Sequence, residues 1–307
     1  MGRIFYYLFL YPLSLLPLPV LYGLSRIIYF ILYRIIAYRK AVVFRNIQNS
    51  FPEQSIKENE ALAKAFYKHF SDIIVEGIKN LSISKKQLLK RFRIRNPELV
   101  EQYYKENKSV ILSSGHFNNW EWLITIQNEL LSHQAIGIGM PISQKSLDNR
   151  INAQRERFGM MVVHSGNYKA HIEGLKNKTF ALLILADQSP GDPIKSYWTT
   201  FLNQPTGFIF GTEIIANTYD LPVIYYTVHK VKRGYYELEF KTISDKPKEM
   251  KYGEITEKYV NFLEKDILKN PSQWIWSHKR WKKTVPEDIK TLKNEHEENF
   301  NTRFRGI

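Results

Sequence analysis

Short apolar runs alternate along this chain with segments whose apolar residues recur at helical spacing. The runs at 109–112, 179–186 and 221–229 are typical of buried strands, and 235–243 alternates like an edge or half-exposed strand. Helical spacing appears at 55–82, 121–131, 147–158, 168–175, 212–218 and 255–268. Strands separated by helices predict an α/β fold: a mixed, largely parallel sheet flanked by helices.

The opening segment is strongly apolar. From Ile4 to Ser25 the chain runs 22 positions without a charge, which is long enough to cross a bilayer. Pro12, Pro17 and Pro19 interrupt this run, and proline is poorly tolerated inside a helix. We expect residues 1–45 to form a membrane-associated helical segment, with anchoring favoured over full spanning. A re-entrant hairpin continuing through 27–36 and a buried apolar hairpin are the alternatives.

Positive charge accompanies this segment. No acidic residue precedes Glu53, whereas six basic residues do: Arg3, Arg26, Arg34, Arg39, Lys40 and Arg45. Such a segment suits an anionic membrane surface. If it spans once, the positive-inside rule leaves the remainder of the chain in the cytoplasm. A cleaved signal peptide is disfavoured, because the apolar region is too long and lacks small cleavage-type residues.

Size and composition fit one catalytic domain, which we assign to residues 46–307. With 307 residues and 44% hydrophobic content, the chain can bury one substantial core. It has no cysteine, which excludes disulfides, thiolate catalysis and cysteine-ligated metals. A net charge of +14 points to an acidic partner: nucleic acid, phospholipid, or a phosphorylated or carrier-protein-linked substrate.

The segment from Ser113 to Trp122 carries a histidine and a carboxylate five positions apart, His116 and Glu121, just after an apolar strand. Imidazole titrates close enough to neutral pH to take the proton of an attacking hydroxyl, and a nearby carboxylate fixes its tautomer. Gly115 permits a sharp turn, so His116 would lie at the carboxyl end of a strand, where α/β sheets place their sites. The pair predicts a general base with its orienting acid.

Each assignment has a structural alternative. Glu121 also fits a capping box with Asn118, in which both side chains satisfy free backbone N–H groups at a helix start. No second histidine stands at metal-ligand spacing from His116, which argues against a zinc site. We expect no metal and no cofactor. His164 and His229 lie in or beside apolar runs and are interpreted as structural.

Six ordered blocks give the chain a family resemblance over nearly its whole length. They are the N-terminal segment, Arg45-Asn46-Ile47 ahead of Ser50-Phe51-Pro52-Glu53, the Gly-His-Phe-x-Asn-Trp-Glu block at 115–121, Arg155-Glu156-Arg157-Phe158-Gly159, Ala186-Asp187-Gln188, and the block from Pro271 to Lys282. The chain resembles the lipid A biosynthesis acyltransferases, the late or secondary acyltransferases of lipopolysaccharide assembly, within the glycerolipid acyltransferase superfamily.

The resemblance implies roles for particular residues. His116 would deprotonate the acceptor hydroxyl while Glu121 orients the ring, an HX4E arrangement, and Arg155 and Asp187 match the second and third family blocks. Arginine suits a phosphate or a developing oxyanion, because its planar fork binds such groups bidentately; Arg157 is a further candidate. The alternatives are an exposed helical ion pair for Arg155 and a loop cap before Ser189-Pro190-Gly191 for Asp187.

The basic and aromatic block near the C-terminus has two interpretations. It comprises Trp274, Trp276, Lys279, Arg280, Trp281, Lys282 and Lys283. The block could face lipid headgroups or acyl carrier protein, since aromatic and basic residues suit such surfaces. The alternative is ordinary packing of the tryptophans beneath a solvated charged edge.

We therefore expect an O-acyltransferase of the inner membrane, with its catalytic domain on the cytoplasmic side. It would move a fatty acyl group from an acyl carrier protein thioester to a hydroxyl of a lipid A precursor in a ternary complex. The nearest alternative is an acyltransferase whose acceptor is a lysophospholipid or an aminolipid. A non-enzymatic basic protein that binds nucleic acid or an anionic membrane is the more distant alternative, and nucleic acid is not an expected partner.

Overall fold

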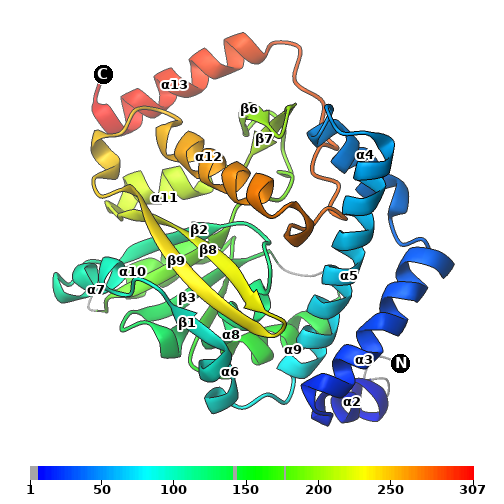
Figure 1. Cartoon of the computed structure of the whole chain (residues 1–307). Coiled ribbons are helices and arrows are strands. Elements are labelled where there is room, and N and C mark those ends of the chain that lie inside the picture. Colours follow the sequence, from blue (N-terminus) through cyan, green and yellow to red (C-terminus); the bar gives the residue numbers. More distant parts are fainter. Residues whose placement is uncertain (1–5, 141–143, 176–177) are drawn as a thin grey trace.

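A seven-stranded sheet forms the centre of the molecule (Figure 1). The computed structural model describes residues 6–140, 144–175 and 178–307. In spatial order the strands are β1 (Phe92–Ile94), β9 (Tyr235–Ser244), β8 (Val223–Lys232), β2 (Val110–Ser114), β5 (Phe180–Leu185), β3 (Gln134–Gly139) and β4 (Met161–His164). Every neighbouring pair is parallel except β8 and β9, which form an antiparallel hairpin. The predicted mixed, largely parallel sheet is confirmed.

Successive residues of the central strands face opposite cores, as strand geometry requires. In β2, Ile111 belongs to one buried cluster, whereas Val110 and Leu112 belong to the other. The first cluster includes residues of α11 (Gly211–Tyr219) and α12 (Glu254–Lys269). The second includes residues of α6 (Lys85–Arg91), α7 (Glu98–Lys105) and α8 (Trp120–Leu130). The sheet therefore lies between two helical layers (Figure 1).

The N-terminal segment is helical and lies along one side of the domain, against α5 (Figure 1). It contains η1 (Tyr6–Leu10), α2 (Tyr11–Leu15), α3 (Leu18–Phe30) and η2 (Ile31–Ile35), followed by α4 (Lys40–Ser50) and α5 (Ile56–Asn80). Pro12 and Pro19 lie in first turns and Pro17 precedes α3, positions where proline is tolerated. The apolar run is therefore divided into α2 and α3 at Leu16 and Pro17, as the prolines predict. Arg3, Ile4 and Phe5 lie outside the described residues.

One helical stretch among the described residues, Leu18–Ile35, is long and apolar enough to cross a membrane, and 22% of it is buried in the molecule. On length and composition alone this is weak evidence for a membrane span. The expected boundary at residue 45 falls inside α4.

The sequence patterns gave no sign of several short elements. Strands β3 and β4 were not predicted from the sequence. In β3, Gly137 and Gly139 interrupt the apolar pattern. A small hairpin of β6 (Tyr197–Phe201) and β7 (Gln204–Phe208) lies outside the main sheet. Two 3-10 turns, η3 (Pro247–Glu249) and η4 (Pro271–Gln273), and the helix α13 (Ile289–Arg305) complete the C-terminal part. Strand β9 is not at the sheet edge, because β1 pairs with its outer side. The remaining helices are α9 (Lys145–Glu156) and α10 (Tyr168–Gly174).

Candidate active site

Two neighbouring parallel strands bring His116 and Asp187 together. Strands β2 and β5 pair in register, Ser114 with Leu185, and each candidate residue stands two positions after its strand's last residue. Parallel strands end at the same edge of a sheet, so the two turns meet there. Gly115 lets them approach, because a Cβ at this position would lie 2.9 Å from Asp187 Oδ2.

The ring of His116 is held by Asp187. Asp187 Oδ1 lies 2.6 Å from His116 Nδ1, while Oδ2 accepts bonds from the His116 backbone N–H and from Trp274 Nε1–H, both at 2.8 Å. The carboxylate is 1% exposed. Burial alone would raise the pKa of Asp187, but the charge and hydrogen bonds of His116, together with Trp274, outweigh it and keep the pKa below its usual value. Asp187 therefore stays ionised and favours the tautomer with its proton on Nδ1.

With that tautomer, His116 Nε2 is a free acceptor. The amide nitrogen of Gln188 lies 3.3 Å from it and is suitably placed to donate. The His116 side chain is 15% exposed, and the edge of its ring packs against Trp120. A substrate hydroxyl that displaces the Gln188 amide could deliver its proton to this nitrogen.

The expected contact between Glu121 and the histidine is replaced by an ion pair. Arg155 donates to both oxygens of Glu121, from one terminal nitrogen at 2.5 Å and from Nε at 3.2 Å. Glu121 lies in the first turn of α8 and Arg155 in the last turn of α9, so the pair joins two helices. Burial would lower the pKa of Arg155, but Glu121 outweighs it and the pKa is raised. The carboxylate that orients His116 is Asp187, supplied by the adjacent strand.

The capping alternative is also resolved. Asn119, not Asn118, is the N-cap of α8, and its side-chain oxygen accepts from Trp122 N–H at 2.9 Å. Asn118 instead adopts a positive φ of 52°, and its amide donates to the Val228 carbonyl and to Gln273. Through these bonds, the turn that contains His116 is held to strand β8 and to the C-terminal block.

Arg157 does not join this group in the described structure. Its guanidinium donates to the backbone carbonyls of Leu81 and Ile83, at 3.2 and 2.9 Å. Burial lowers the pKa of Arg157. Its fork therefore ties α9 to the connection between α5 and α6.

Buried residues of the C-terminal block pack next to the site, where Trp274 bonds to Asp187. Trp274, Trp276 and Arg280 are each at most 1% exposed, so their ordinary packing, the second interpretation, holds for these residues. Arg280 donates to Thr206 Oγ1 and the Gly207 carbonyl and stacks over Phe208. Lys279 and Lys282 remain exposed.

Sequence reasoning missed His278. Its Nε2 accepts from the Ser189 backbone N–H at 3.0 Å, which fixes the loop that follows Asp187. Burial, opposed by the charge of Asp187, lowers the pKa of His278 to about 4, so the ring is neutral at pH 7. The position of His278 inside the basic block is the only sequence signal that pointed to it.

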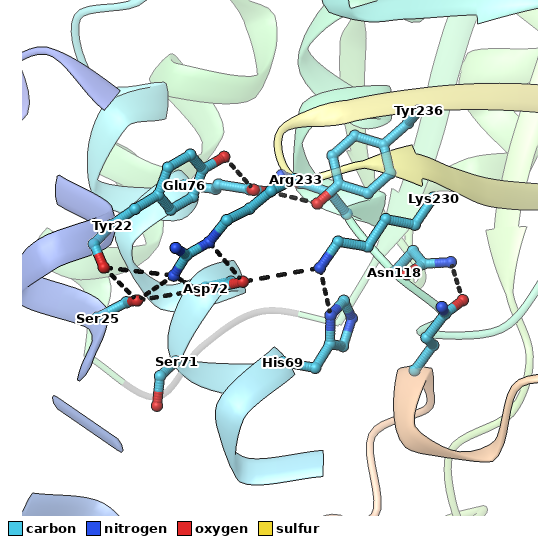
Figure 2. Close-up of polar contacts among 12 residues, drawn as sticks. Tyr22, Ser25, His69, Ser71, Asp72, Glu76, Asn118, Lys230, Arg233 and Tyr236 are labelled. Carbon is cyan, nitrogen blue, oxygen red and sulfur yellow. Dashed lines mark hydrogen bonds and ion pairs between the residues drawn. The ribbon is translucent and has the colours of Figure 1, made fainter. Parts of the chain in front are cut away.

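A second polar network joins this region to the N-terminal helices (Figure 2). Glu76 of α5 accepts from Tyr22 of α3, Tyr236 of β9 and Asn119, each at 2.6 Å. Glu76 is fully buried, and burial raises its pKa despite these bonds. One buried carboxylate thus contacts α3, the sheet and the cap of α8.

A charged branch of this network continues along α5 (Figure 2). Arg233 pairs with Asp72 and also bonds Ser25 of α3. Lys230 Nζ lies 3.7 Å from Asp72 and 3.3 Å from His69 Nδ1. Burial, reinforced by Lys230, lowers the pKa of His69 to about 3. This branch is structural and holds α3 to the domain.

His164 and His229 make contacts in keeping with structural roles. His229 Nε2 lies 2.6 Å from Glu239, and His164 Nε2 lies 3.7 Å from Asp148. Within the described ranges, no group of three or more His, Cys, Asp or Glu side chains could hold a metal ion.

Comparison with known proteins assigns the chain to a family. A search of curated proteins finds no match. The sequence profile of the bacterial lipid A biosynthesis acyltransferases, however, matches residues 1–283. This range includes His116, Glu121, Arg155 and Asp187, and it ends before α13. The chain belongs to the bacterial lipid A biosynthesis acyltransferase family and is an acyltransferase.

Proposed function

We propose that this acyltransferase of lipid A biosynthesis moves a fatty acyl group from an acyl carrier protein thioester to a hydroxyl of a lipid A precursor, with His116 as the general base. The observation that carries the proposal is the bond from His116 Nδ1 to the buried, ionised Asp187, which leaves Nε2 as an acceptor. The family supplies the acyl transfer and the lipid A pathway, and the large positive charge suits an acidic carrier protein.

The proposed reaction is a direct transfer. The acceptor hydroxyl gives its proton to His116 Nε2 while its oxygen attacks the thioester carbonyl, forming a tetrahedral oxyanion. The carbon–sulfur bond then breaks, and the departing sulfur takes the proton back from the imidazolium. Asp187 stabilises that imidazolium throughout, so no covalent acyl-enzyme is required.

Glu121 positions the guanidinium of Arg155 for substrate binding. Glu121 occupies one edge of the Arg155 fork, and the remaining N–H groups of the guanidinium can serve a phosphate or the oxyanion. Glu121 thus acts as a positioning residue for Arg155, and only Asp187 orients His116.

We also propose that residues 1–45 attach the enzyme to the inner membrane while residues 46–307 remain on the cytoplasmic side. One face of α3 is occupied by α5, through buried Leu21 and the bonds of Tyr22 and Ser25. Other apolar side chains of α3, of η2 and of the residue after η2 are more than half exposed, among them Val20, Ile27, Phe30, Ile35 and Ile36. Such a two-faced segment suits anchoring in the interface.

The catalytic proposal is tested with purified protein, acyl carrier protein thioesters and defined acceptors. His116→Ala should abolish transfer, whereas His164→Ala, at a 43% exposed histidine, should retain it. Competition between a lipid A precursor and a lysophospholipid identifies the acceptor. Turnover by His116→Ala at the wild-type rate would end the mechanism.

Membrane attachment has a separate test. Ile27→Glu combined with Phe30→Glu should release the protein from anionic vesicles in a flotation assay, because both side chains are exposed and apolar. Exposed Ile56→Glu, outside the segment, is the matched control. Equal flotation of all three proteins would exclude anchoring through the outer face of α3.

A further inference from the structure

A cavity of about 690 Å³ opens beside the catalytic turn. Its size lies within the range of roughly 300–1,000 Å³ that is usual for small-molecule sites. Part of its wall is the loop after Asp187, including Gln188. The rest of its wall is largely apolar, with contributions from Ile209, Phe210, Ile214, Tyr252, Phe300 and Phe304.

Gln188 connects this cavity to the reacting nitrogen. Gln188, whose side-chain amide lies 3.3 Å from His116 Nε2, is also one of the residues that line the cavity. The thioester carbonyl that is attacked by a hydroxyl bound at Nε2 would therefore lie near a residue that borders this cavity. In an acyl transfer, the apolar group attached to the reacting carbonyl is the fatty chain.

Helix α13 forms one wall of this cavity, although it lies beyond the family match at residues 1–283. The ring of Phe300, 3% exposed, packs against Phe210 and Tyr252 at centroid distances of 6.0 and 5.5 Å. At the end of the helix, Arg305 donates to the carbonyls of Met250 and Pro247 and to Asn217. The helix is thus bound firmly enough to act as a wall.

The location favours the donor chain over the chains of the acceptor. Helix α13 and the apolar helix α3 lie on opposite sides of the molecule (Figure 1). A membrane lipid held near α3 keeps its own chains on that side. A carrier protein can deliver a single chain to the other side.

We propose that the cavity holds the fatty acyl chain of the thioester donor and that α13 sets the chain length the enzyme prefers. This inference rests on the proposed acyl transfer at His116. It assigns a specificity role to residues outside the part of the chain that matches the family.

Two substitutions change the cavity in opposite directions. A Cβ at Gly211, which lines the cavity, meets only Ile209 within contact distance, at 3.6 Å, so Gly211→Leu narrows the space without a backbone clash. Phe300→Ala enlarges it. Two controls match the second change: Glu298→Ala alters an exposed position of α13, and Phe92→Ala removes a buried ring from the core cluster that contains residues of α6, α7 and α8.

The assay measures kcat/KM for acyl carrier protein thioesters from decanoyl to hexadecanoyl with one acceptor. Gly211→Leu should shift the preference toward shorter chains and Phe300→Ala toward longer ones, each changing the long-to-short ratio about tenfold, as expected for one or two methylene groups in an apolar pocket. Both controls should keep the wild-type ratio.

The outcomes separate the two proposals. A wild-type protein that transfers no acyl group from any thioester overturns the proposed function, and this inference with it. Transfer with an unchanged chain-length ratio in Gly211→Leu, a variant that needs no core truncation, overturns the inference alone. If the variants instead change the preference for the chain length of the acceptor lipid, the cavity holds the acceptor, and the inference is also overturned.

Discussion

Replacing Asp187 by asparagine should invert the tautomer of His116. Oδ2 of Asp187 accepts from two N–H donors, the His116 backbone and Trp274 Nε1, each at 2.8 Å. An asparagine must keep its carbonyl oxygen at that place, because its NH2 group would leave both buried donors without an acceptor. The NH2 group then faces His116 Nδ1, which becomes an acceptor, and the ring proton moves to Nε2.

A histidine with its proton on Nε2 cannot take a proton from the acceptor. General base catalysis typically contributes about 10²–10⁴-fold, so kcat should fall by this factor, equivalent to about 3–5 kcal/mol of activation free energy. Single-turnover transfer from acyl carrier protein thioester measures the loss. Nitrogen NMR of the imidazole reports the tautomer independently of activity.

Stability provides the control for this prediction. Asp187→Asn retains an acceptor for both N–H donors and should melt close to the wild type. Asp187→Ala leaves both donors unpaired, at about 1–3 kcal/mol each, and should unfold more readily. Wild-type kcat in Asp187→Asn, or an imidazole that keeps its proton on Nδ1, would refute the orienting role of Asp187.

Three further results are expected. Glu121→Gln should weaken transfer by raising KM and should leave the pH dependence of kcat unchanged, because Glu121 acts through Arg155. A pH dependence of kcat that shifts as in an Asp187 variant would contradict this. His69 has a pKa of about 3 in the folded protein and 6.5 in the unfolded chain, so the folded protein keeps its ring neutral. Its contribution to the free energy of unfolding is therefore complete above pH 6.5 and falls by about 5 kcal/mol as the pH drops toward 3. Acid unfolding of His69→Gln should therefore be less steep across that window, and an equal slope would exclude His69 as the cause. Tyr22→Phe removes one donor from buried Glu76 and should cost about 1–3 kcal/mol in denaturant unfolding; no loss would show that the bond contributes little.

The turn that carries His116 was predictable because its signals are local. A short apolar run, a glycine and a histidine placed His116 after a strand, as the structure shows for β2. The partner of His116 was predicted incorrectly because spacing along the chain compares only near neighbours. Asp187 lies 71 positions away and reaches His116 through the pairing of β2 with β5, which the sequence does not specify.

The same limit applies to the basic and aromatic C-terminal block. Its composition fits a membrane surface and a buried support equally well, since tryptophan and arginine serve in both. The deciding facts are tertiary. Trp274 bonds to Asp187, and Arg280 finds carbonyl and hydroxyl acceptors in β7. A buried arginine with such partners is stable, but the residues around Arg280 in the sequence do not indicate which distant residues these partners are.

The most consequential feature that the sequence concealed is Glu76. Taking a carboxylate out of water costs several kcal/mol, so a fully buried one persists only with compensating donors. Its donors are Tyr22 of the apolar α3, Tyr236 of β9, and Asn119, the cap of the helix that carries Glu121. The N-terminal helices are therefore part of the folded domain, because removing α3 would leave one oxygen of this buried carboxylate without a donor.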